Sequence, residues 1–162
     1  MDYNKLSELL FGHIKKIPAD YEALYPKRNL PEGAKVTRFA PSPTGFLHIG
    51  GLFASLISER IAHQSDGVFI LRIEDTDKKR EVADGVSKIL EGLLGFGVKI
   101  DEGFVDFDKQ EGNYGPYMQS QRAEIYQCFA KELVKKGKWR IMGGWYLQPD
   151  CTMPSAEGFL RQ

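Results

Sequence analysis

The sequence lacks an excess of either charge, because 22 Lys and Arg residues are matched by 22 Asp and Glu residues among 162. A protein that attracts nucleic acid through an overall basic field carries a surplus of positive charge, so any such contact has to be local here. Long apolar stretches are missing as well. No run approaches the roughly 18 residues of a membrane-spanning helix, and no apolar segment of a signal peptide stands near the start. We therefore expect a cytoplasmic protein that makes no contact with a membrane.

Cysteine is scarce, and its two positions exclude two further classes of protein. Cys128 and Cys151 show neither the CxxC spacing of a zinc site nor the number that a disulfide framework needs. We therefore expect no zinc or other metal ion bound by the protein itself, and a place for Cys128 in the core. Internal repeats and low-complexity tracts are missing too. The composition, with 42% hydrophobic and 27% charged residues, is typical of an α/β domain with a buried core.

The most informative segment is residues 38–51, with the sequence RFAPSPTGFLHIGG. It continues a short run that is typical of a β-strand, and Pro41 and Pro43 then prevent both helix and ladder hydrogen bonds. Helix is expected again from near Leu47, because apolar residues recur at the spacing of one helical face. The face that we expect to be buried consists of Ile49, Leu52, Phe53, Leu56, Ile57 and Ile61. The segment therefore predicts a strand, a stiff extended loop and an amphipathic helix.

The turn before this helix has the properties of a phosphate-binding site. The first backbone N–H groups of a helix have no partner within it, and the helix dipole adds roughly half a positive charge there. His48 stands at this turn, where a lone histidine is more often a cap or a solvated side chain than a catalytic group. Gly50 and Gly51 leave the first helical turn without side chains that would keep an adenine ring away. We predict a nucleotide site.

A second apolar run, residues 68–73, predicts a strand that is buried on both faces. Strand, helix and strand then form a right-handed crossover unit of a parallel sheet with flanking helices, which binds ligands at the carboxyl ends of its strands. A further amphipathic helix is expected over residues 82–96, a long loop over residues 101–118 and another helix after it. The polar residues at the predicted ligand edge are Arg38, Arg72, Glu74, Asp75 and Asp77.

These segments resemble, in order, the motifs of the glutamyl-tRNA synthetases. The sequence HIGG at 48–51 resembles the HIGH signature of the class I aminoacyl-tRNA synthetases, with Gly51 in place of the second histidine. The other matching segments are RFAPSPTG at 38–45, RIEDTD at 72–77, DEG at 101–103 and GPYMQSQR at 115–122. The resemblance covers residues 35 to about 138. It implies an α/β fold, the partial Rossmann-like nucleotide-binding fold of class I catalytic domains.

The resemblance also implies a reaction, in which glutamate is activated by ATP to glutamyl-adenylate and transferred to tRNA(Glu). It assigns contacts with glutamate to Arg38, Ala40, Ser42 and Glu74. It assigns contacts with ATP to Pro41, His48, Gly50 and Gly51, with His48 as the catalytic residue. Mg²⁺ is expected to accompany ATP, held largely by phosphates and water. Tyr114 and Tyr117 either stack on the acceptor end of tRNA or pack their loop onto the core. The expected state is a monomer.

Beyond Lys138 the resemblance fails. We predict a helical extension and linker (1–34), a first half of the catalytic domain with the start of the acceptor-binding insertion (35–138), and an uncertain tail (139–162). The tail is consistent with a diverged hairpin, a cloning artefact or a shifted reading frame. The Lys-rich KMSKS signature is absent from the sequence, so we expect an amino-terminal fragment without activity of its own.

Three other functions compete with this interpretation. Glutaminyl-tRNA synthetases typically carry PPEPNG where this chain has APSPTG, and Asp where it has Glu74, so both positions favour glutamate. The shortened glutamyl-queuosine tRNA synthetase usually lacks the DEG and GPY segments that are present here. A non-catalytic paralogue that holds nucleotide or the tRNA acceptor end without turnover is the third alternative, and the missing KMSKS signature favours it.

Overall fold

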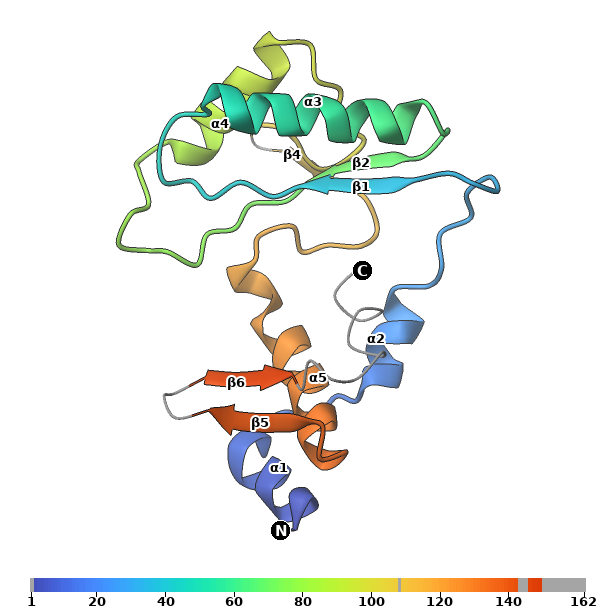
Figure 1. Cartoon of the computed structure of the whole chain (residues 1–162), viewed down its shortest axis with the longest axis vertical. Helices are drawn as coiled ribbons and strands as arrows, with labels where there is room; N and C mark the ends of the chain where they lie inside the picture. Colours follow the sequence, from blue (N-terminus) through green and yellow to red (C-terminus); the bar gives the residue numbers. More distant parts are fainter. Residues whose placement is uncertain (1, 108, 143–145, 150–162) are drawn as a thin grey trace. The chain divides into compact units, whose positions relative to one another are not determined.

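The computed structural model describes residues 2–107, 109–142 and 146–149, the last two strands as backbone only (Figure 1). The chain divides into two compact units. One consists of residues 25–123, and the other combines residues 2–24 with the described residues from Glu124 onward. Each unit has a core of its own. The predicted nucleotide-binding segment lies wholly within the first.

A four-stranded sheet in the order β1-β2-β3-β4 forms the centre of the unit of residues 25–123. Its strands are β1 (Val36–Phe39), β2 (Val68–Leu71), β3 (Glu102–Asp106) and β4 (Lys109–Glu111). β1 pairs in parallel with β2, β2 pairs in parallel with β3, and β4 returns antiparallel to β3. The crossover helices are α3 (Ile49–His63) and α4 (Gly85–Gly95). This arrangement confirms the predicted α/β fold with a parallel-dominant sheet, a partial Rossmann-like fold.

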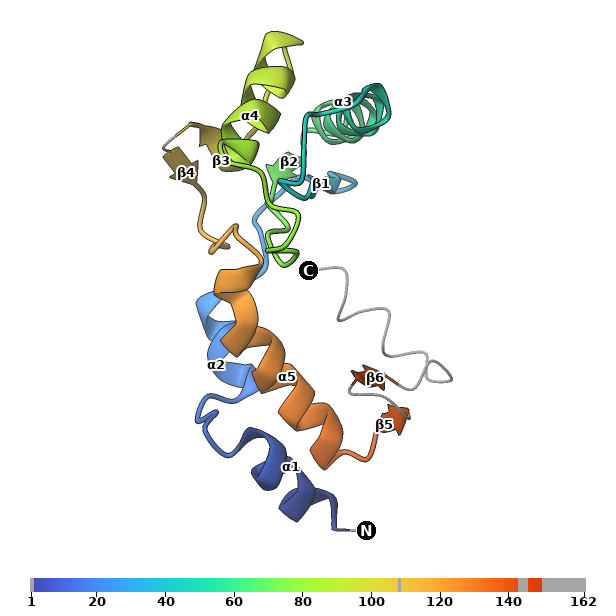
Figure 2. The ribbon, with the colours of Figure 1, turned by 90° about the vertical axis from the view of Figure 1, so that its left-hand side faces the viewer.

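Both crossover helices cover the same face of the sheet (Figures 1 and 2). Two consecutive right-handed crossovers that move across the sheet in one direction place their helices on one side. The side chains of β2 alternate accordingly: Phe69 and Leu71 are fully buried under the helices, whereas Val68 and Ile70 are half-buried. The prediction that this strand is buried on both faces is therefore wrong for this unit. An apolar run shows that both faces tolerate burial, but the topology decides which face is covered.

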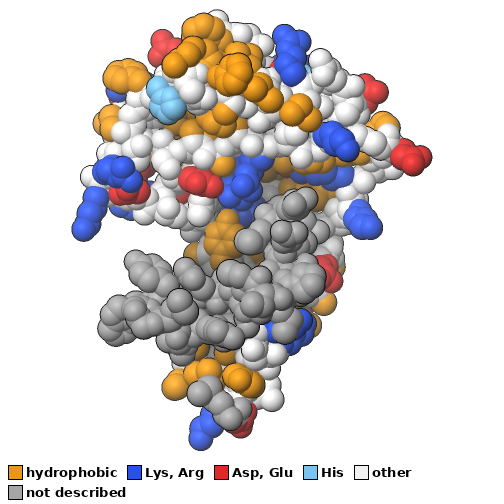
Figure 3. Space-filling view, in the orientation of Figure 1, with side chains coloured by type: hydrophobic (Ala, Val, Ile, Leu, Met, Phe, Trp, Pro, Cys, Tyr) orange, Lys and Arg blue, Asp and Glu red, His pale blue; other side chains and the backbone are white. Residues whose placement is uncertain are grey.

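The predicted buried face of α3 is only partly correct. Leu52 is buried and Leu56 packs against the core, but Ile49 is 79% exposed and Phe53 is 64% exposed. Ile57 and Ile61 are exposed as well, and Figure 3 shows hydrophobic side chains gathered along this helix. The residues that α3 buries are Leu52, Ser55, Glu59 and Ala62. The Ser55 hydroxyl donates to the Leu52 carbonyl, which allows a polar side chain to be buried.

The segment that was predicted as a long loop folds into the hairpin of β3 and β4. Glycine permits this, because Gly103 has a positive φ of +98° and a Cβ there would lie 1.9 Å from the carbonyl oxygen of Leu71. Only a residue without a side chain lets β3 approach β2 this closely. The loop prediction for residues 101–118 is therefore wrong at its start. The part from Gly112 to Tyr117 remains irregular.

In the other unit, the described residues with side chains form helices. Its helices are α1 (Tyr3–Phe11), α2 (Pro18–Leu24) and α5 (Ala123–Lys135), the last preceded by a 3₁₀ turn (Ser120–Arg122). Cys128 is buried in α5, as predicted. β5 (Trp139–Met142) pairs antiparallel with β6 (Tyr146–Pro149), and the rest of the predicted tail, with Cys151, lies outside the described residues. Among the described residues, no helix combines the length and the apolar character needed to span a bilayer.

Candidate functional site

The extended loop after β1 is fixed through its carbonyl groups. Phe39 accepts a hydrogen bond from the N–H of Arg72 at 3.0 Å, and Pro41 accepts one from the N–H of Glu74 at 2.9 Å. Pro43 accepts one from the N–H of Val82 at 3.0 Å. Proline has no N–H to donate, so Pro41 and Pro43 can join the backbone of neighbouring segments only through their carbonyl groups. These bonds bring the RFAPSPTG loop and the RIEDTD segment together, as the parallel pairing predicts.

His48 is the N-cap of α3. Its backbone is extended, with φ −87° and ψ 164°, and its Nδ1 accepts a hydrogen bond from the N–H of Gly51 at 3.2 Å. A ring nitrogen that accepts carries no proton, so the proton of the neutral imidazole is assigned to Nε2. The side chain is exposed. One imidazole therefore caps the helix through Nδ1 and offers a donor through Nε2 at the end where the helix dipole is positive.

Each of the two glycines after His48 lies too close to a different neighbouring side chain to carry a Cβ without strain. A Cβ on Gly50 would lie 3.1 Å from Cε1 and Nδ1 of the His48 ring. A Cβ on Gly51 would lie 2.9 Å from Cδ1 of Leu47. Gly50 therefore makes room for the capping imidazole. An apolar hollow of about 320 Å³ lies beside it, lined by Ile49, Gly50, Leu52, Phe53 and Leu56. The contact of Gly50 and Gly51 with ATP remains a prediction.

The predicted glutamate residues lie at the carboxyl ends of β1 and β2. Arg38 is paired with Ile70 in register, so its side chain leaves the sheet on the same face as those of Arg72 and Glu74. Nη2 of Arg72 lies 3.4 Å from Oε1 of Glu74, and the Glu74 side chain is 36% exposed. Ala40 is half-buried, and the Ser42 side chain is exposed in the loop. The structure thus brings together a guanidinium-rich face and a carboxylate.

Arg72 received no role in the sequence analysis, although it belongs to the same edge. Its Nε is buried without a hydrogen-bond partner among the described residues, and its side chain is 12% exposed. A buried donor without a partner is uncommon in folded proteins. The sequence offered one signal for it, the two-residue spacing between Arg72 and Glu74, which places both on one face of an extended segment.

Asp75 is the second residue of this edge that the sequence analysis left without a role. It is 2% exposed and accepts hydrogen bonds from the N–H and the hydroxyl of Ser120. Burial alone raises the pKa of its carboxyl, but the hydrogen bonds from Ser120, with help from Lys78, outweigh burial and hold the pKa below its ordinary value. Asp75 therefore remains an ionised carboxylate at neutral pH.

Residues 35–139 match the family model described as tRNA synthetases class I (E and Q), catalytic domain. The chain belongs to this family. Its match begins just before β1 and includes every sequence motif that frames the site. The synthetase motifs and the geometry agree, because the HIGG turn caps α3 and the RIEDTD segment follows β2 at the same edge of the sheet.

Relatives of this synthetase chain are known by sequence and by structure. It is 56% identical over 137 residues to the glutamate–tRNA ligase of Clostridium perfringens strain 13, and 57% identical over 139 residues to that of Acetivibrio thermocellus. Each match covers 85% of this chain and 25% of the relative. A crystal structure of a glutamate–tRNA ligase from Elizabethkingia meningosepticum in complex with its amino acid matches with a TM-score of 0.58 and 43% identity, over 64% of this chain and 20% of that one. The chain therefore spans about a quarter of the length of these curated relatives.

The two tyrosines predicted to contact tRNA, Tyr114 and Tyr117, are held by hydrogen bonds and ring contacts within the unit of residues 25–123. Tyr117 is 4% exposed, and its hydroxyl donates to Oε1 of Glu102 at 2.8 Å while accepting from the N–H of Tyr114 at 3.0 Å. Arg28 binds the same carboxylate through Nη1 at 2.5 Å and Nη2 at 2.7 Å, and its guanidinium lies 3.8 Å from the centre of the Tyr114 ring. Of the two expected roles, stacking on tRNA or packing the loop onto the core, the Tyr117 ring has the second. At 4% exposure, it offers no face on which a base could stack.

We expect Tyr117→Phe to lower the free energy of unfolding by about 2 kcal/mol, because it leaves the buried Glu102 carboxylate and the Tyr114 N–H each one partner short. Urea unfolding followed by far-UV circular dichroism measures the change. Tyr126→Phe is the matched control, because Tyr126 is exposed on α5, and it should change the free energy by less than about 0.5 kcal/mol. Equal values for the two variants would contradict a structural role for the Tyr117 hydroxyl.

The same hydroxyl predicts a dependence on alkaline pH. Burial, and then the hydrogen bond to Glu102, raise the pKa of Tyr117 to about 12, above the value of roughly 10 in an unfolded chain. The folded state therefore holds this proton more tightly. Its contribution to stability is complete below about pH 10 and is lost as the pH rises from about 10 to 12. The unfolding free energy of Tyr117→Phe should lack this part of the alkaline decline.

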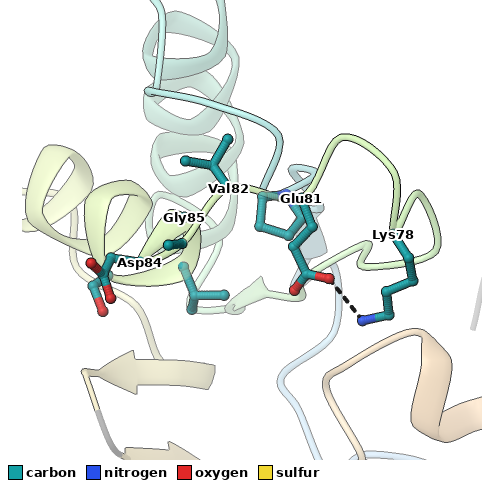
Figure 4. Close-up of a pocket in the computed structure, with 9 residues that line it drawn as sticks. Lys78, Glu81, Val82, Asp84 and Gly85 are labelled. Carbon is teal, nitrogen blue, oxygen red and sulfur yellow. Dashed lines mark hydrogen bonds and ion pairs between the residues drawn. The ribbon is translucent and has the colours of Figure 1, made fainter.

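A polar hollow of about 430 Å³ lies beside Pro43 in this unit (Figure 4). Its other walls are formed by Lys78 and by the segment from Glu81 to Ser87, and the Lys78 amine lies 3.0 Å from a Glu81 oxygen. Gly85 is buried there, and a side chain would not fit because a Cβ would lie 2.6 Å from the Pro43 carbonyl oxygen. None of the residues predicted to contact glutamate or ATP lines this hollow. It marks where the segment after RIEDTD packs on the loop after β1.

Proposed function

We propose that this chain is the part of a glutamate–tRNA ligase that binds glutamate and the phosphates of ATP. One observation supports this proposal most strongly. The start of α3, which His48 caps, follows the loop that leaves β1, and the end of β1 and the extension of β2 carry Arg38, Arg72 and Glu74 on one sheet face. A nucleotide and an amino acid are the two substrates that must meet in this reaction. The names and identities of the curated relatives support the choice of glutamate.

In the proposed reaction, an α-carboxylate oxygen of glutamate attacks the α-phosphorus of ATP. The bond from that phosphorus to the bridging oxygen breaks, and pyrophosphate leaves. Protein groups contribute by positioning and by stabilising phosphate charge. The Nε2–H of His48 and the free N–H groups at the start of α3 donate to phosphate oxygens. Pro41, Gly50 and Gly51 contact the nucleotide, and the apolar hollow beside Gly50 is suited to the adenine ring.

The amino acid is held by groups of opposite charge. The Glu74 carboxylate binds the α-ammonium through a charge-assisted hydrogen bond, and the planar fork of Arg38 binds the side-chain carboxylate. Ser42 adds a hydroxyl hydrogen bond, and the small Ala40 lets the substrate approach the backbone. Mg²⁺ comes with ATP, bound mainly by phosphates and water. Among the described residues, no group of three or more His, Cys, Asp or Glu is placed to hold a metal ion.

Two outcomes follow for this chain and for a chimeric enzyme. The chimera is the Clostridium perfringens relative in which this chain replaces the quarter that it matches. We expect the chimera to catalyse exchange of labelled pyrophosphate into ATP that depends on glutamate and not on glutamine. The isolated chain should show no exchange above its His48→Ala variant, and should bind ATP no more tightly than millimolar, about −4 kcal/mol.

The comparison of substrates separates the competing functions. A folded chimera that prefers glutamine contradicts the proposed specificity. A folded chimera without any exchange, together with retained binding of ATP, supports the non-catalytic alternative. Exchange by the isolated chain above the His48→Ala control contradicts the view that the rest of the relative is needed. Circular dichroism of each sample establishes that it is folded.

A further inference from the structure

The residue next to Glu74, which is proposed to bind the amino acid, has a buried carboxylate. This carboxylate is bonded to a segment 45 residues further along the chain. Asp75 follows Glu74 directly. Its Oδ1 accepts a hydrogen bond from the N–H of Ser120 at 2.8 Å, and its Oδ2 accepts one from the Ser120 hydroxyl at 2.5 Å. Lys78 approaches Oδ2 at 3.1 Å, but 60% of its side chain is exposed. One serine therefore holds both oxygens of a carboxylate that solvent hardly reaches.

The backbone around Glu74 depends on contacts of this kind, because it lies outside the regular sheet. β2 ends at Leu71, and the pairing with β3 ends with it. Beyond that point, Ile73 forms an isolated parallel bridge with Met118, and Glu74 donates its N–H to the Pro41 carbonyl. The segment of residues 117–120 thus replaces β3 as the neighbour of this extension.

Side chains along the extension alternate between two sides. Ile73 and Asp75 are buried, while Glu74 between them is 36% exposed on the face of Arg72. Consecutive Cα atoms are about 3.8 Å apart, so a displacement of Asp75 moves Glu74 directly. The bonds that fix Asp75 therefore also fix the direction in which the Glu74 carboxylate points.

We propose that Ser120 is a positioning residue for the amino acid, because it anchors Asp75 and thereby orients the neighbouring Glu74 carboxylate. The inference rests on the proposed function of Glu74 and deepens it. Without the Ser120 hydroxyl, the exposed Lys78 ammonium is the side-chain partner that Oδ2 keeps among the described residues. A buried carboxylate that is short of donors shifts toward water or another donor. The proposed site for the ATP phosphates is a different one, the start of α3.

The test is the kinetics of pyrophosphate exchange in the chimeric enzyme. We expect Ser120→Ala to raise the KM for glutamate about tenfold and to leave the KM for ATP within about twofold. Ser120→Thr keeps a hydroxyl and should keep the KM for glutamate within about twofold. Ser58→Ala is the matched control, because the Ser58 hydroxyl donates to the Ala54 carbonyl within α3 and should change neither constant.

Several outcomes overturn the inference. Equal increases of both KM values, or a loss of rate that follows the folded fraction measured by circular dichroism, show a merely structural role. If Ser120→Ala does not fold, the isosteric pair Ser120→Thr and Ser120→Val decides, because only threonine can donate to Asp75. Equal KM values for glutamate in that pair overturn the role of the hydroxyl. A chimera with Ser120 intact that shows no glutamate-dependent exchange overturns the proposed function together with this inference.

Discussion

In the chimeric enzyme, Arg38→Gln is expected to lower kcat/KM for glutamate by a factor of about 100 or more. Arg38 lies on β1 in register with Ile70, on the sheet face that carries Glu74. The fork of a guanidinium matches a carboxylate, and a charge-assisted pair of this kind contributes about 3 kcal/mol, which corresponds to roughly 100-fold. Pyrophosphate exchange at varied glutamate concentration measures the loss. The KM for ATP should remain within about threefold.

Two further variants show whether the effect belongs to this site. Arg38→Lys keeps the charge but loses the fork, and we expect an intermediate loss. Arg60→Gln removes an exposed guanidinium from α3, 3.6 Å from a Glu59 oxygen, and should leave exchange unchanged. Unchanged kinetics with glutamate in Arg38→Gln would show that Arg38 has no part in recognising the amino acid.

The predicted strand, loop and helix of residues 36–63 were correct because their signals are local. Pro41 and Pro43 act on their own backbone, and the helix start at His48 follows from the cap and the apolar spacing after it. The meeting of the polar residues at one edge of the sheet was also predictable. Parallel strands that are linked by a crossover helix end at one edge, so Arg38 and Glu74 could be brought together from the order of the elements alone.

The errors concern contacts between segments that are distant in the sequence. The spacing of Ile49, Phe53 and Ile57 predicts a helix, but only the position of the sheet decides that Leu52 points inward while they stay exposed. The approach of β3 to β2 depends on a single glycine, Gly103, which reads as a loop residue in isolation.

The roles of Ser120 and of the Tyr117 hydroxyl could not be predicted from the sequence for the same reason. The bond between Asp75 and Ser120 joins residues whose types carry no mark of pairing. The Tyr117 hydroxyl is buried against Glu102, whereas an aromatic residue in a glycine-rich segment is equally consistent with base stacking. Burial and distant hydrogen bonds follow from the assembled fold, so they required the structure.

His48→Ala in the chimeric enzyme is expected to lower the rate of glutamate activation by a factor of about 100 to 1,000, the usual loss for a donor to developing charge. The stability cost should be much smaller. The variant removes the Nδ1 that caps Gly51 in α3, and losing a cap costs about 1 kcal/mol. Single-turnover formation of glutamyl-adenylate gives the rate, and urea unfolding of the same samples gives the stability.

His48→Asn separates the capping hydrogen bond that the structure shows for this imidazole from the proposed donation to phosphate. The asparagine oxygen can accept from the Gly51 N–H and is among the best N-caps, so the stability lost in His48→Ala should return. The Nε2–H donor does not return with it, because the shorter amide ends where the cap bond is made. Activation by His48→Asn should therefore stay within about threefold of His48→Ala. Recovery of activation along with stability would show that His48 acts only by capping α3, and that the helix N–H groups alone hold the phosphates.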